Sequence, residues 1–206
     1  LMWSYSGHTG SVNGVDVDVD GYVYTAGSDG TIKKLALDGQ SSLWSVSEHS
    51  GAINGIFVDI DKNVYSYSDD NTVKKYSGVD GAVLWTFTGH TDNVVDVVVN
   101  QYGTVYSVAT NGILKTINDS GAEVTSYDLE DTITGIDIDV SGFLYVSLLN
   151  DGVIRITDSA VELWVYDNHT SNVTTVACTH QVVMYPPVIT EAIFYALYPP
   201  ENLTAE

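Results

Sequence analysis

Apolar and polar residues alternate in short runs along most of the chain, and turn-forming residues interrupt these runs every eight to ten positions. The second such set is complete, because residues 52–59, 64–68, 72–77 and 83–88 each have the pattern of a strand. A period of two residues is typical of strands with one buried face. No stretch carries the apolar stripe of a helix. The pattern therefore predicts an all-β protein.

The strand pattern repeats with a period of about 40 residues. His8, His49 and His90 are 41 residues apart, and Leu129 and His169 continue the register at spacings of 39 and 40. Two aromatic columns keep the same register: Trp3, Trp44, Trp85 and Trp164 with Val124 in the fourth copy, and Tyr24, Tyr65, Tyr106, Tyr145 and Tyr185. Four antiparallel strands in each of five tandem copies predict the four-stranded blades of a β-propeller.

Each copy is expected to run from an inner strand to an outer strand. The inner strands are predicted near residues 12–18, 53–59, 94–100, 133–139 and 173–178, and include Val15, Ile56, Val97 and Ile136. The outer strands are predicted near residues 1–6, 42–47, 83–88, 122–128 and 162–167, and include the Trp column. The pattern thus begins with an outer strand that belongs to none of the first four blades, and it ends in a fifth blade that lacks an outer strand.

The copies predict one domain over residues 1–197 and a tail over residues 198–206. The repeats lie near residues 7–47, 48–88, 89–128, 129–167 and 168–197. We expect residues 1–6 to complete the fifth blade, because closing the ring removes the exposed sheet edges. The alternative is a fragment of a propeller with six to eight blades.

The charge of the chain restricts its partners. It has 27 Asp and Glu against 7 Lys and Arg, a net charge of −20. Such a field repels phosphate, so we expect no nucleic-acid partner. No apolar run approaches the roughly 20 residues that a membrane span needs, so no membrane insertion is expected. The single Cys178 cannot form an internal disulfide.

Residues 7–9 read Gly-His-Thr, and residues 28–33 read Ser-Asp-Gly-Thr-Ile-Lys. These segments resemble the WD-repeat blade, although the Trp-Asp dipeptide of that family is absent. The resemblance implies a buried network in which a loop His, a strand Ser or Thr and a turn Asp are hydrogen-bonded. With a spacing of 21 residues, the implied pairs are His8 with Asp29, His49 with Asp70, and His90 with Asn111.

Residues 38–44 and 80–85 are similar to the tryptophan-docking segment of propellers of the pyrroloquinoline-quinone (PQQ) type. Propellers of these two types with the same Asp, Tyr and Gly texture look like those of phage virions and prokaryotic surfaces. The resemblance therefore implies an exterior location, on a virion or outside the cell. It extends to about residue 185 and leaves the function open, because propellers host many unrelated roles.

One polar column is a candidate cation or water site. Ten residues after each anchor stand Asp18, Asp59, Asn100, Asp139 and, in the last copy, Thr179. As neighbours of the inner strands they are expected at one end of the central channel, where they form a mostly acidic axial ring. The competing interpretation, which we favour, is that each side chain caps its own turn. The recurrent His residues are separated by whole blades, which favours a structural role over a metal site.

The chain contains no Gly-x-Ser-x-Gly, zinc-ligand spacing or phosphate loop. Regular repeats also disfavour a unique active site, so we expect neither an enzyme nor a bound cofactor. The function we predict is a non-catalytic scaffold that binds a protein or forms part of an assembly. Two alternatives stay open: a carbohydrate-binding lectin with one site per blade and a glycosidase with paired carboxylates.

Overall fold

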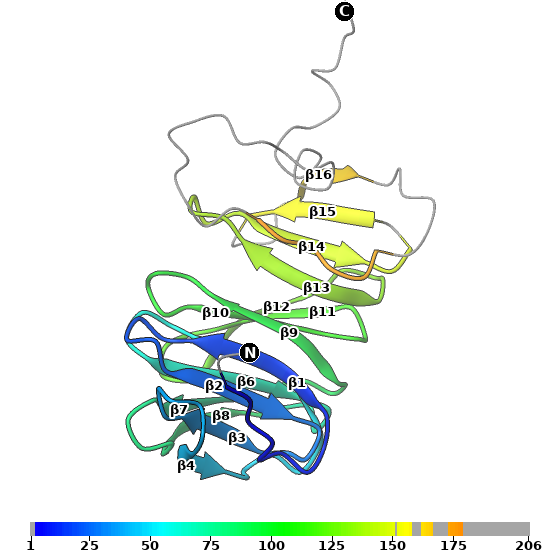
Figure 1. Cartoon of the computed structure of the whole chain (residues 1–206). Helices are drawn as coiled ribbons and strands as arrows, with labels where there is room; N and C mark the ends of the chain where they lie inside the picture. Colours follow the sequence, from blue (N-terminus) through cyan, green and yellow to red (C-terminus); the bar gives the residue numbers. More distant parts are fainter. Residues whose placement is uncertain (1–2, 151, 158–161, 167–172, 179–206) are drawn as a thin grey trace, which may run out of the picture.

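The computed structural model describes residues 3–150, 152–157, 162–166 and 173–178 (Figure 1). Within these ranges it consists of sixteen strands joined by turns and loops, with no helix. The all-β prediction is confirmed. None of the described residues belongs to a helix long and apolar enough to cross a membrane.

The strands form four sheets of four, each antiparallel and in chain order. Blade 1 contains β1 (Val12–Val17), β2 (Val23–Gly27), β3 (Ile32–Leu35) and β4 (Ser42–Val46). Blade 2 contains β5 (Ile53–Val58), β6 (Asn63–Ser68), β7 (Val73–Ser77) and β8 (Val83–Phe87). Blade 3 contains β9 (Val94–Val99), β10 (Val105–Ala109), β11 (Ile113–Ile117) and β12 (Glu123–Asp128). Blade 4 contains β13 (Ile133–Ile138), β14 (Leu144–Leu148), β15 (Gly152–Ile156) and β16 (Glu162–Tyr166).

The core lies between the blades rather than inside any one of them. Three clusters of buried residues bridge blades 1 and 2, blades 2 and 3, and blades 3 and 4. The inner strands β1, β5, β9 and β13 lie next to one another, as predicted. Ile56, Val97 and Ile136 are buried at their faces. The predicted outer Trp residues lie on β4, β8 and β16.

Side chains of one inner strand bind the backbone of the next. Three such side chains donate a hydrogen bond of 2.9 Å to a backbone carbonyl: Asn13 Nδ2 to Ile53, Asn54 Nδ2 to Val94, and Thr134 Oγ1 to Val173. The carboxylates of Asp16, Asp96 and Asp137 accept from the backbone N–H groups of Val58, Ile136 and Cys178 at 2.7, 3.0 and 2.6 Å. These hydrogen bonds link each blade to the following copy.

The hydrogen bonds from Thr134 to the Val173 carbonyl and from the Cys178 N–H to Asp137 place residues 173–178 beside β13 (Figure 1, orange). The segment is not assigned as a strand, and neither are residues 3–6. Both expected strands are therefore absent from the described residues, because neither segment pairs there with a neighbouring ladder. The structure describes four complete blades. The closure by residues 1–6 and the remainder of the fifth copy involve residues outside the described ranges.

Glycines in the turns between the third and fourth strands contact the tryptophans that precede each blade in the chain. Gly121 has φ = 85°, and a Cβ built on it lies 2.7 Å from Cγ of Trp85, in the preceding blade. Gly81 faces Trp44, and Gly39 faces Trp3, in the same way. A hydrogen at this position lets the indole of one blade lie against the turn of the next. Trp3 thus contacts blade 1 as the outer-strand tryptophans of blades 1 and 2 contact their neighbours.

Gly142 provides a matched comparison, since it has φ = 86° and an added Cβ has no neighbour within 4 Å. Gly142→Ala should lower the free energy of unfolding only by the cost of a left-handed alanine, about 1–2 kcal/mol. Gly121→Ala should lower it by about 1–3 kcal/mol more, because Trp85 is also displaced. Urea unfolding measures both. Equal losses would contradict the docking of Trp85 on this turn.

Candidate functional site

Both predicted His–Asp pairs lie in contact, where the loop entering each blade meets the turn between its second and third strands. In blade 1, His8 Nδ1 lies 3.1 Å from Asp29 Oδ1, and Nε2 lies 2.8 Å from Thr25 Oγ1. In blade 2, His49 Nδ1 lies 2.9 Å from Asp70 Oδ2, and Nε2 lies 2.6 Å from the Ser66 hydroxyl. This end of the propeller is called the network end below.

The protonation of the network follows from its partners. Burial alone would raise the pKa of the Asp70 carboxyl, but hydrogen bonds from Thr72 and His49 outweigh it and lower the pKa to about 2. Burial lowers the pKa of His49 despite the opposing effect of Asp70. A neutral His49 can donate from Nδ1 to the Asp70 carboxylate and accept at Nε2 from the Ser66 hydroxyl, so that both ring nitrogens have a hydrogen-bond partner. The pair therefore fixes loop geometry at neutral pH.

Blade 3 lacks this pairing. His90 Nε2 lies 2.8 Å from the Ser107 hydroxyl, but within the described structure its buried Nδ1 has no hydrogen-bond partner. Asn111 instead donates from Nδ2 to Thr91 Oγ1 at 3.1 Å. Burial, assisted by the charge of Lys115, lowers the pKa of His90 to about 4. An amide at position 111 thus leaves His90 without the acceptor that a carboxylate supplies.

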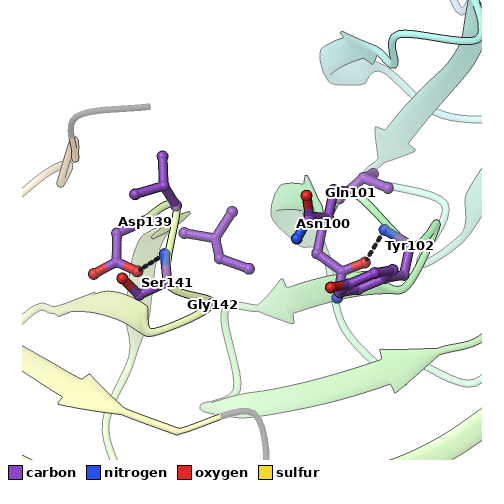
Figure 2. A pocket seen from close by; sticks show the side chains of 9 residues that line it. Asn100, Gln101, Tyr102, Asp139, Ser141 and Gly142 are labelled. Carbon is purple, nitrogen blue, oxygen red and sulfur yellow. Dashed lines mark hydrogen bonds between the residues drawn. The ribbon is translucent and has the colours of Figure 1, made fainter. Parts of the chain in front are cut away.

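The axial column lies at the opposite end, in the turns between first and second strands. Asp139 Oδ1 accepts from the backbone N–H groups of Ser141 and Phe143 at 2.8 and 3.1 Å. Asn100 Oδ1 accepts from Tyr102 and Thr104 at 2.9 and 3.0 Å. Asp18 and Asp59 accept from their own turns in the same way. Figure 2 shows Asn100 and Asp139 bonded within their own turns on either side of a hollow.

The four column residues are occupied by local hydrogen bonds and come from four separate turns. Among the described residues, no group of three or more His, Cys, Asp or Glu side chains has an arrangement that could hold a metal ion. The tyrosine column completes the arrangement: Tyr24, Tyr65 and Tyr145 donate from their hydroxyls to Asp18, Asp59 and Asp139 at 2.9, 3.0 and 3.1 Å.

A basic column that sequence reasoning missed packs on these tyrosines. Lys34, Lys75 and Arg155 lie 5.0, 5.3 and 5.6 Å from the ring centres of Tyr24, Tyr65 and Tyr145, respectively. Trp44, Trp85 and Trp164 lie beside the same three rings, with centroids 5.8, 6.0 and 6.1 Å apart. The signal was present in the sequence, because three of only 7 basic residues fall at one repeat position. Each of blades 1, 2 and 4 thus has an Asp, Tyr, cation and Trp quartet.

The predicted Trp column is wrong by one residue in blade 3. β11 and β12 pair Thr116 with Thr125, as β7 and β8 pair Lys75 with Trp85. Thr125 therefore occupies the Trp position, and Val124 points to solvent. The reason is that the connection from the outer strand of blade 3 to the inner strand of blade 4 is one residue shorter than the corresponding connection from blade 2 to blade 3. Trp85 precedes Val94 by nine residues, whereas Thr125 precedes Ile133 by eight.

The end of the propeller that carries the axial column also exposes apolar side chains. Its turns, between first and second strands and between third and fourth, present Val19, Leu37, Ile60, Val79, Tyr102 and Val140. Tyr102 is 79% exposed and Ile60 is 77% exposed. Two hollows lie between the turns: one of about 370 Å³ between blades 3 and 4 (Figure 2), and one of about 610 Å³ between blades 2 and 3. This end is called the turn end below.

Asn111→Asp should complete the network of blade 3. The new carboxylate can accept from His90 Nδ1, so the pKa of His90 should rise from about 4 and the free energy of unfolding should increase by about 1 kcal/mol. NMR titration of the His90 ring and urea unfolding measure the two effects.

The wild-type chain should lose stability as the pH falls from about 6.5 towards 4, because the unfolded histidine binds a proton that folded His90 excludes. Asn111→Asp should lose less over the same range. Asn111→Ala, as the control, should leave the pKa of His90 unchanged. An unchanged pKa in the Asp variant would contradict the inferred pairing.

Comparison with known proteins bears on the first copy. The model of the WD domain, G-beta repeat (WD40) matches residues 1–34, which include His8 and Asp29. No curated protein matches the chain. WD40 repeats commonly serve as non-catalytic scaffolds for protein interaction. The repeat match and the four four-stranded sheets together support a WD-repeat β-propeller.

Proposed function

We propose that this propeller is a non-catalytic scaffold that binds a protein partner through its turn end. The observation that carries the proposal is the asymmetry between the two ends. Six of the seven described turns at this end expose a large apolar side chain, and the exception is the turn at residues 118–122. The described loops at the network end are residues 7–11, 28–31, 47–52, 69–72, 88–93, 110–112, 129–132 and 149–150, and no large apolar side chain is exposed in them. Clustered exposed apolar groups mark interaction surfaces in soluble proteins.

The charges around these apolar groups indicate the partner. An exposed aspartate directly follows four of the six apolar residues: Asp20 follows Val19, Asp38 follows Leu37, Asp61 follows Ile60, and Asp80 follows Val79. A surface that alternates aliphatic groups with carboxylates fits a protein segment that combines apolar anchors with Lys or Arg. The net charge of −20 adds long-range attraction for such a segment.

The candidate reactive groups support a binding role over catalysis. The carboxylates of Asp18, Asp59 and Asp139 accept hydrogen bonds from their own turns and from a tyrosine. The carboxylates of Asp29 and Asp70 are bonded to histidines. These groups hold the turns in place and thereby present the apolar tips on a rigid frame. The setting we propose is a virion or cell surface, where propellers of similar Asp-, Tyr- and Gly-rich texture are found.

One apolar face of β1 is not covered by any blade that the structure describes, and we include it in the proposal. Val15 is 67% exposed, whereas its counterpart Val97 is 3% exposed beneath the preceding blade. Val12 and Val17 on the same face are also exposed. We propose that the C-terminal copy and residues 1–6 form a fifth blade over this face. The support is that Trp3 contacts the Gly39 turn of blade 1 while residues 173–178 continue the inner-strand contacts beyond blade 4.

The interface is tested with a yeast-displayed library of short random peptides selected on the intact chain. Enriched peptides should combine apolar and basic residues. The triple variant Ile60→Ser, Tyr102→Ser and Val140→Ser should weaken their binding roughly tenfold or more, because interface energy concentrates in a few anchors. The control is Leu84→Ser with Leu163→Ser, two exposed apolar residues of outer strands, which should change nothing.

Two results would overturn the interface. One is binding that survives the triple variant while circular dichroism shows both proteins folded. The other is glycan-array binding in a stoichiometry of one sugar per blade, which would favour a lectin.

The fifth blade is tested by deleting residues 1–6. The deletion should uncover sheet edges and the apolar face of β1, so the protein should form oligomers or aggregates on size-exclusion chromatography. Ser4→Ala with Ser6→Ala, exposed positions of the same segment, should remain monomeric. A deleted protein that stays monomeric with unchanged melting would refute this closure.

A further inference from the structure

Blade 3 departs from the quartet of the other blades at three of its four positions. Asn100 replaces the aspartate, Thr116 replaces the cation, and Thr125 replaces the tryptophan. Only Tyr106 is retained. The acid and the base are lost together, so no unpaired charge remains. The side chains that fill this region in blades 1, 2 and 4 are replaced by shorter, uncharged ones.

A pocket lies where these side chains are missing. It has a volume of about 390 Å³, and its lining includes Asn100, Tyr106, Thr116 and Thr125. This volume is at the lower end of the range of roughly 300–1,000 Å³ for ligand pockets, which suits one small ring system. None of the lining residues carries a charge, although the chain as a whole has a net charge of −20.

Two buried hydroxyls of the pocket lack partners. Thr116 is only 6% exposed, and its Oγ1 has no hydrogen bond to any part of the chain that the structure describes. The same holds for Oγ1 of Thr125, directly across the strand pair. Buried hydroxyls without a partner are uncommon in folded proteins and cost stability. A bound molecule with a polar hydrogen can supply the missing hydrogen bond.

The other blades show which molecule fits. In blade 2 the corresponding space holds the indole of Trp85, which meets the ring of Tyr65 edge-on at 62°. Its Nε1 donates to the Asp119 carbonyl at 3.0 Å. In blade 1, Trp44 lies beside Tyr24 and donates to the Gly78 carbonyl at 3.3 Å. In these two blades the space therefore holds a planar ring beside a tyrosine, and the one polar hydrogen of the ring is directed to a carbonyl of the following blade.

We propose that blade 3 carries a binding pocket for one uncharged, planar aromatic ring with a single N–H or O–H donor, an indole above all. The ring packs on Tyr106, and its donor binds the hydroxyl of Thr116 or Thr125. Two sources share this chemistry, a free small molecule and an aromatic side chain of a protein. The pocket does not depend on the peptide interface proposed above.

The probes are indole, N-acetyl-tryptophanamide and tryptamine, titrated by calorimetry against the intact chain at about 0.15 M salt. Indole should bind with a dissociation constant on the order of 0.1–1 mM, as expected for a ligand of this size. ¹³C-methyl labelling of threonine should show shifts at Thr116 and Thr125. Equal binding of N-acetyl-tryptophanamide indicates a protein side chain as the source, and binding of indole alone indicates a free small molecule.

Two variants test the site. Thr116→Val keeps the shape and removes the hydroxyl, so it should weaken indole binding roughly three- to tenfold. Thr125→Trp should fill the pocket with the variant's own indole and abolish binding. Thr86→Val, which removes an exposed hydroxyl on the outer strand of blade 2, is the control and should bind indole as the wild type does.

Several results would overturn the proposal. No heat and no methyl shift with any probe would make the pocket a solvent-filled packing gap, even if Thr125→Trp raises the melting temperature. Binding of glucose or galactose without binding of indole would replace the aromatic ligand with a saccharide. Tryptamine binding more than tenfold tighter than indole would replace it with a cation.

Discussion

The structure depends on the covering of each blade's apolar face by the blade before it. A four-stranded blade alone leaves the apolar face that it shares with its neighbour exposed to water, and each core cluster here is shared between two blades. The exposed aliphatic face of β1 shows what a blade presents when that cover is missing. The tryptophan and glycine contacts at the outer strands and the hydrogen bonds at the inner strands hold adjacent blades in the alignment that this burial requires.

The sequence predicted the repeated elements well, because repeat register multiplies a weak signal. Every inner and outer strand of the four described blades lies within a residue or two of its expected position. The period-two pattern and the Gly turns are local properties, so they can be read without tertiary context. The segments at both ends were harder to predict, since a strand without a paired neighbour forms no ladder even where its alternation is present.

The site was less accessible to sequence reasoning. The spacing of His8 and Asp29 indicated their contact, since two antiparallel strands bring both ends of a 21-residue segment together. The role of Lys34 and Lys75 was not recognised, because a lone basic residue on a strand usually faces solvent. The shift from Val124 to Thr125 depended on one missing residue in a loop. Such a change leaves the alternation intact and becomes visible only in the cross-strand pairing.

In the part of the chain that the structure describes, the side-chain hydrogen bonds between inner strands run in one direction only. The donor or acceptor side chains of Asn13, Asp16 and Thr134 belong to the earlier blade, and the later blade contributes only carbonyl or N–H groups of its backbone. Every residue other than proline has both groups. A copy therefore needs no particular side chain at these positions to be accepted by the copy before it. At the inner strands, gene duplication can therefore add or exchange blades without matched substitutions on both sides of a new junction, whereas the tryptophan and glycine contacts at the outer strands have to be matched.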